Sequence, residues 1–183
     1  SGDWSSDVCS SDLRWRTSRG VLTAQRHGNH MTEFPVKTEE DLRLWHEIQK
    51  NLEFRLNPDY GDEQRTGRWR VDWKWSPVQE MLQFVTGVET FYYLLTDAPE
   101  RMKALLDTMH ANNLRGVEIA LASNPQAVAF QLTENTSSQM ISPALYEELS
   151  VPNVRDTIDL AHGRGLKGVV HMCGMLRGLF DGI

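Results

Sequence analysis

Apolar runs alternate with amphipathic helical patterns in the second half of the chain, and this alternation most constrains the fold. Two short runs, AVAFQL at residues 127–132 and KGVVHM at residues 167–172, are bounded by turn residues, as buried parallel strands are. Helical periodicity precedes the first run over residues 100–123 and resumes at residues 142–162 before the second. Helix, strand, helix and strand with short connections predict a parallel α/β fold.

Two further elements are expected before this region. Thr38 stands where a helix cap would stand, with Asp41 three positions later, and an amphipathic pattern follows over residues 39–56. The aromatic-rich stretch GRWRVDWKW at residues 67–75 alternates and predicts a short strand or hairpin. Its tryptophans could form a stacking platform or could simply pack in the core.

Polar residues follow each predicted strand. ENTSS begins at Glu134, and HMCG begins at His171. Active sites of parallel α/β domains lie at the carboxyl ends of strands, so Glu134, Asn135, His171 and Cys173 are expected on one rim. Gly174 permits a sharp turn and a close approach to the backbone.

His171 and Cys173 are candidate metal ligands. Residues two apart on a strand point to the same side, and imidazole and thiolate are two of the best zinc ligands. An alternative is a hydrogen-bonded core histidine beside an inert buried thiol. Glu134 could likewise only cap a helix or accept a backbone hydrogen bond.

Composition narrows the possible partners and compartment. The 183 residues carry a net charge of −6 without a basic block, so no nucleic-acid partner is expected. No apolar run approaches the ~18 residues that span a membrane. Only two cysteines are present, which indicates a reducing, cytoplasmic compartment.

The first thirteen residues, SGDWSSDVCSSDL, are expected to be an artefact or disordered. The string repeats SSD, lacks a period and resembles a translated sequencing adapter, so residues 1–13 are set apart from the fold. Residues 14–31 show no clear period and predict an irregular segment. Residues 32–183 are expected to form the folded domain.

The stretch from ENTSSQMISPALYEELSVPNVRDTIDLAHGRG to LKGVVHMCGML resembles the uroporphyrinogen decarboxylase superfamily. FPVKTEEDLR and SPVQEMLQFVTGVETFYYLLTDAPERMKALL are similar to the same superfamily, and HMCG is most similar to its corrinoid-dependent thiol methyltransferases. The resemblance implies a (β/α)8 TIM barrel. It also implies that His171 and Cys173 bind zinc together with a more distant cysteine.

The activity implied by this resemblance is methyl transfer from a corrinoid partner protein to a small thiol. Glu134 would be the catalytic carboxyl, as a further zinc ligand or as a group that orients His171. Asn135, Thr136 and Ser137 would position the polar group of the substrate. One alternative is a decarboxylase, although Asn135 occupies a serine position of the decarboxylase pattern; another is a non-catalytic binding paralogue.

The resemblance also concerns the extent of the chain. A TIM barrel takes about 250 residues, more than the 183 here. The chain is therefore expected to be an internal fragment of the barrel that is inactive alone. The third zinc-binding cysteine would then lie beyond Ile183.

Overall fold

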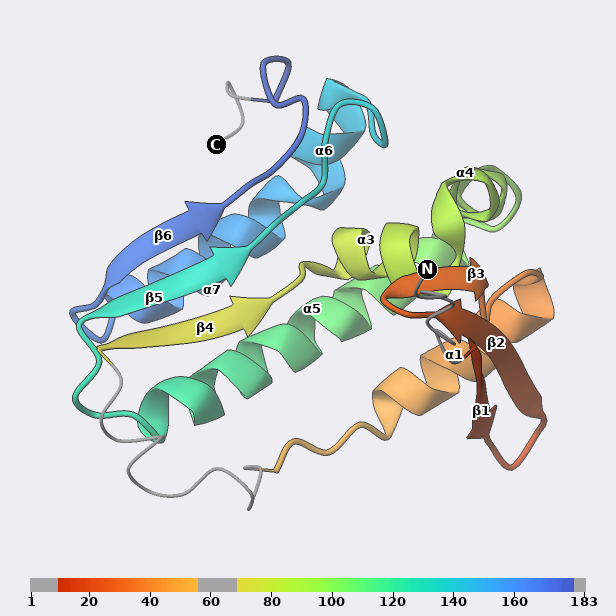
Figure 1. Cartoon of the computed structure of the whole chain (residues 1–183), viewed down its shortest axis with the longest axis horizontal. Helices are drawn as coiled ribbons and strands as arrows, with labels where there is room; N and C mark the ends of the chain where they lie inside the picture. Colours follow the sequence, from red (N-terminus) through yellow and green to blue (C-terminus); the bar gives the residue numbers. More distant parts are fainter. Residues whose placement is uncertain (1–9, 56–68, 180–183) are drawn as a thin grey trace, which may run out of the picture.

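The structure is a computed structural model that describes residues 10–55 and 69–179 (Figure 1). An antiparallel sheet holds β1 (Ser10–Arg16), β2 (Val21–His27) and β3 (His30–Glu33), and a parallel sheet holds β4 (Arg70–Lys74), β5 (Ala129–Thr133) and β6 (Lys167–His171). The helices are α1 (Glu39–Lys50), α3 (Pro77–Glu80), α4 (Gly87–Asp97), α5 (Pro99–Ala122), α6 (Pro143–Leu149) and α7 (Val151–His162). A π-helical turn, η1 (Met81–Val85), joins α3 to α4. No helix of the described residues is long and apolar enough to cross a membrane.

The parallel sheet confirms the α/β interpretation of the sequence. β5 lies between β4 and β6, and all three strands run the same way (Figure 1). α5 packs on β4, α7 packs on β5 and β6, and the two helices contact each other, so both cover one face. The buried core on this face consists of Val71, Val117, Leu121, Phe130, Leu132, Val154 and Ala161. No barrel closes within the described residues.

The opposite face of the parallel sheet is polar and partly open. Successive side chains of a strand alternate, so residues between the core positions point away from α5 and α7. On this face Arg70 pairs with Asp72 at 2.8 Å. Asp72, Val169 and His171 are exposed. His171 therefore ends β6 on the side that the helices leave uncovered.

The prediction that residues 14–31 form an irregular segment is wrong, because these residues include most of an antiparallel sheet. β1 also begins at Ser10, so residues 10–13 are paired rather than disordered, whereas residues 1–9 lie outside the described residues. In β2 only Leu22 and Ala24 are buried. Two buried positions among polar residues give too short an alternation to identify a strand.

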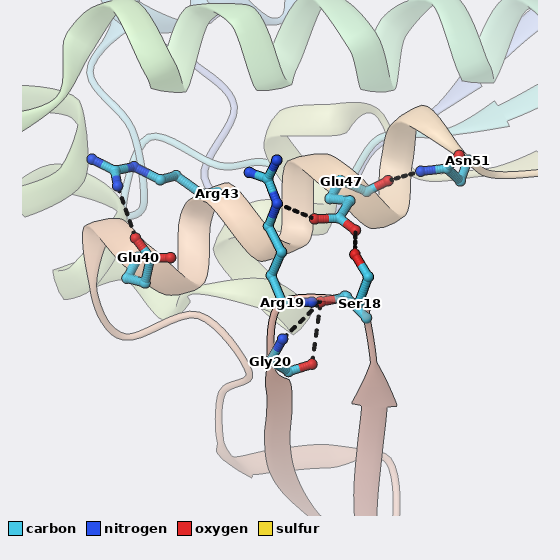
Figure 2. A network of polar contacts seen from close by, with 8 residues as sticks. Ser18, Arg19, Gly20, Glu40, Arg43, Glu47 and Asn51 are labelled. Atoms are coloured by element: carbon cyan, nitrogen blue, oxygen red, sulfur yellow. Dashed lines mark hydrogen bonds and ion pairs between the residues drawn. The ribbon is translucent and has the colours of Figure 1, made fainter.

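The turn between β1 and β2 fixes the first sheet on α1 (Figure 2). Figure 2 shows Ser18 and Arg19 on either side of Glu47: the Ser18 hydroxyl donates to Oε1 at 2.9 Å, and the Arg19 Nε lies 3.7 Å from Oε2. Nearby, the Trp15 ring meets the Trp45 ring edge-on with centroids 5.5 Å apart. Because Arg19 is largely exposed, the ring contact stabilises this junction more than the ion pair does.

Local capping signals define several helix starts. The Thr38 hydroxyl accepts from the Asp41 N–H at 3.2 Å, and the Asp41 carboxylate accepts from the Thr38 N–H at 3.0 Å, which confirms the predicted cap. Ser76 and Ser142 cap α3 and α6 with the side-chain hydroxyl alone, which accepts from the N–H three residues later. The first helix ends at Lys50, earlier than residue 56.

A glycine marks the break between η1 and α4. Gly87 has φ +70°, a conformation that glycine adopts without strain, and α4 begins there after η1 ends at Val85. Residues 177–179 form a turn.

We predict that Gly116→Ala lowers the free energy of unfolding by about 1–3 kcal/mol through overpacking. Gly116 lies on α5, where an added Cβ would overlap the Trp73 ring and lie 2.9 Å from the Phe54 ring. At Gly163, at the end of α7, an added Cβ has its nearest neighbour at 3.4 Å. Urea unfolding followed by tryptophan fluorescence should show no loss for Gly163→Ala, and equal effects of the two variants would contradict the packing described.

Candidate functional site

The loops that follow β5 and β6 lie side by side at one edge of the parallel sheet. The Glu134 N–H donates to the His171 carbonyl at 2.8 Å. Further out, the Ser138 N–H and hydroxyl both donate to the Met175 carbonyl, at 2.9 and 2.8 Å. This arrangement confirms the expectation that ENTSS and HMCG share one rim.

Gly174 allows the two loops to approach each other. Its φ is +94°, and an added Cβ would lie 2.9 Å from the Ser137 Cβ. A side chain here would strain the backbone and also push the loops apart. The glycine after Cys173 therefore brings Ser137 close to the backbone beside the candidate metal ligands.

His171 and Cys173 converge at the end of β6. The His171 Nε2 lies 3.0 Å from the Cys173 Sγ, a hydrogen-bonding distance for sulfur. Both residues are exposed within the described part of the chain. Two soft donors thus point to one place on the open face of the sheet.

The donor set of this pair suits zinc. Tetrahedral zinc holds a nitrogen and a sulfur ligand roughly 3.5 Å apart, so a small side-chain rotation from 3.0 Å would accommodate the ion. Within residues 10–55 and 69–179, no third His, Cys, Asp or Glu completes a metal-binding group with His171 and Cys173. The third cysteine implied by the family resemblance stays a prediction.

The Glu134 side chain does not form a metal-binding group with this pair within the described residues. Thr133 is in register with His171 on the open face, so the next residue of the chain turns to the helix-covered side. Glu134 is fully buried, and its carboxyl makes no hydrogen bond to the described residues. The expectation that it serves as a further zinc ligand with His171 and Cys173 is therefore not met in the described part.

Burial controls the protonation of Glu134. Loss of solvent raises the pKa of its carboxyl, and nearby hydroxyl and N–H groups of Ser76 and Thr136 only partly oppose this rise. These groups face the carboxyl without reaching hydrogen-bond geometry. Glu134 is thus a carboxyl that tends to keep its proton inside the protein.

Tyr146 is a member of this buried polar group that the sequence analysis did not find. It lies on α6, is 1% exposed, and its hydroxyl makes no hydrogen bond to the described residues. Burial and the negative charge of Glu134 raise the pKa of the Tyr146 hydroxyl. The hydroxyls of Thr136 and Ser150 are also buried without a hydrogen-bond partner in this part of the chain. The only sequence signal was a tyrosine on the first turn of a capped helix.

The substrate-positioning residues expected from the sequence have little exposure. The Asn135 N–H donates to the Gln79 Oε1 at 2.8 Å, which ties the loop to buried α3. Thr136 is completely buried, and Ser137 is 6% exposed. Of the three, only Ser137 is shown beside the His171–Cys173 loop, at Gly174.

The tryptophans of the β4 region were expected either to form a stacking platform or to pack in the core, and they differ from one another in the structure. Trp73 packs against Phe54 with centroids 6.2 Å apart, as a core residue does. Trp75 follows β4 with φ 59°, and its ring contacts the Phe84 ring at a tilt of 37° with centroids 4.3 Å apart. Trp69 is 63% exposed. Only Trp75 lies at the carboxyl end of its strand.

A family model described as uroporphyrinogen decarboxylase (URO-D) matches residues 75–183, more than half of the chain. The chain belongs to the uroporphyrinogen decarboxylase family. The matched segment starts directly after β4 and includes both polar loops of the candidate site. Membership of this enzyme family implies a TIM-barrel-like fold, consistent with the parallel sheet. No curated protein and no solved structure matches the chain.

We predict that Glu134→Gln gains stability relative to the unmodified protein as the pH rises from 5 to 8. The unfolded carboxyl ionises near its ordinary pKa of 4.5, whereas the folded one holds its proton to higher pH. The unmodified protein therefore loses stability above pH 4.5 until the folded pKa is reached, and glutamine removes this loss.

Urea midpoints at both pH values test this prediction. Glu118→Gln, an exposed change on α5, is the matched control. Burial also raises the pKa of Glu80. Because Glu80 is present in all three proteins, its contribution to the pH dependence of stability cancels in the comparison. A Glu134→Gln effect that is the same at pH 5 and pH 8 would show that the carboxyl is not held protonated.

Proposed function

We propose that this member of the uroporphyrinogen decarboxylase family is a zinc-dependent methyltransferase that moves a methyl group from a corrinoid carrier protein to a thiol. The observation that carries the proposal is the His171–Cys173 pair. Its two donor atoms lie 3.0 Å apart at the carboxyl end of β6, and both side chains are exposed. A structural histidine and thiol would more often be buried.

His171 and Cys173 would hold the zinc through Nε2 and Sγ, together with a third cysteine. Bound zinc would lower the pKa of a thiol and keep it as a nucleophilic thiolate. In the transfer, the thiol would lose its proton to solvent and its sulfur would bond to the methyl carbon. The carrier would give up the methyl group and keep the electron pair of the broken bond.

The loop after β5 supplies the neighbouring wall of this site. We assign Asn135, Thr136 and Ser137 to positioning the polar part of the thiol substrate, with Ser137 nearest because it packs at Gly174. Glu134 tends to hold a proton behind this wall, near Thr136. The exposed face of the sheet leaves His171 accessible to a small thiol.

Decarboxylation is the second candidate. It is favoured by the description of the matching family and by Glu134, a buried carboxyl that tends to stay protonated. A decarboxylase replaces a carboxyl group with a proton, so it needs such a donor. In that case His171 and Cys173 would have no metal to hold, and carbon dioxide would be the product.

We predict that His171→Ala and Cys173→Ser each lower the zinc content of the purified full-length protein by at least about tenfold. Loss of one protein ligand leaves the ion with too few donors to be retained. His162→Ala is the matched control, because His162 is an exposed histidine on α7. Metal content is measured by mass spectrometry, and methyl transfer from a methylated corrinoid protein to a thiol is measured on the same samples.

Two results would count against methyl transfer. One is that the full-length protein contains no zinc. The other is that the Cys173→Ser variant keeps as much zinc as the unmodified protein. Release of carbon dioxide from a porphyrinogen by the zinc-free protein would establish decarboxylation instead.

A further inference from the structure

A cavity lies between the antiparallel sheet and the π-helical turn, and neither member of the metal pair lines it. Its volume is about 550 Å³. It is lined by Leu13, Trp15, Arg26, Asn29, Met31, Trp45, Trp75, Glu80, Phe84 and Val85. Of residues 10–13, Leu13 lines the cavity, and it lies on β1 together with Trp15.

Aromatic rings form the walls of this cavity in two pairs. The Trp15 and Trp45 rings meet edge-on at 5.5 Å, joining β1 to α1. The Trp75 and Phe84 rings meet at 4.3 Å, joining the end of β4 to η1. Each of these rings therefore contacts another ring on a different element.

Glu80 brings a carboxyl group to the same cavity. It is the last residue of α3, and none of the hydrogen bonds or ion pairs within the described residues engages its side chain. Burial raises the pKa of the Glu80 carboxyl to about 7. Arg26, an exposed residue of β2, is the other charged residue of the lining.

We propose that this cavity binds a small organic cation of the quaternary ammonium class. The faces of aromatic rings attract cations, most strongly those of tryptophan, and weakly hydrated ammonium groups lose little on leaving water. Three tryptophans and one phenylalanine line the same cavity as this carboxyl, which makes no ion pair with the described residues. A cation would supply the missing charge, whereas a neutral ligand would leave the carboxyl desolvated and unpaired.

The carboxyl makes this site selective for charge rather than for shape alone. An apolar ligand could fill the cavity, but only a cation would gain from ionised Glu80. An anion would meet the aromatic faces and Glu80 unfavourably, and only exposed Arg26 would attract it. Affinity for a cation should therefore rise between pH 6 and pH 8, as Glu80 releases its proton. This proposal does not rest on methyl transfer, because zinc binding and cation binding use different residues.

Isothermal titration of the full-length protein with choline tests the proposal. The matched neutral probe is 3,3-dimethylbutan-1-ol, which has the same shape without the charge. We expect choline to bind at least about tenfold more tightly than the alcohol at pH 8. Glu80→Gln should reduce choline affinity at least about tenfold and remove its pH dependence, because the variant keeps the shape of the cavity.

Two further variants separate charge in the cavity from charge elsewhere. Arg26→Gln removes a like charge from the lining, so choline should bind equally well or more tightly. Glu118→Gln, on the exposed side of α5, should leave the affinity unchanged. Circular dichroism and the urea midpoint show whether each variant is folded, and Trp45→Phe serves as a milder probe of the wall if Glu80→Gln is unstable.

The proposal is overturned by any of three results. Equal affinities for choline and the alcohol would show an apolar cavity without charge selection. Absence of choline binding at millimolar concentration would show that the cavity is not a cation site. Unchanged affinity in Glu80→Gln, with the variant folded, would place any bound choline elsewhere.

Discussion

The parallel pairing of β5 with both β4 and β6 is the constraint on which the rest of the structure depends. It sends three carboxyl ends to one edge, so loops far apart in the sequence become neighbours. Phe130 and Leu132 fix the orientation of β5, because both side chains are completely buried on the side of α5 and α7. Because Thr133 of β5 is in register with His171 of β6, this orientation places His171 on the open face. Glu134, the next residue after Thr133, is buried.

The same alternation separates two kinds of chemistry at a single edge. On the open face, His171 and Cys173 present a nitrogen and a sulfur donor to solvent. On the covered face, Glu134 and Tyr146 keep protons in a buried polar group. Trp75, the residue after β4, lines a third region, the aromatic cavity that Glu80 also lines. The parallel sheet thus carries the candidate metal site, and the residue after β4 contributes to the lining of the separate candidate cation site.

Sequence patterns predict the elements with long or specific signals. The Thr38 cap, the long α5 and the shared rim of ENTSS and HMCG follow from spacing alone. The sequence analysis did not predict the antiparallel sheet. In β2 only Leu22 and Ala24 are buried, so the strand lacks a long hydrophobic alternation. The burial of Glu134 beside Tyr146 was also missed, since it depends on the packing of α6, which no local pattern records.

The central claim is that His171 and Cys173 bind zinc, and X-ray absorption at the zinc edge of the full-length protein tests it most directly. The account predicts sulfur scatterers at about 2.3 Å and a nitrogen scatterer at about 2.0–2.1 Å. It also predicts that Cys173→Ser removes the contribution of one sulfur. Zinc surrounded only by oxygen and nitrogen, or a sulfur shell that Cys173→Ser leaves unchanged, would contradict the assignment of this edge as a metal site.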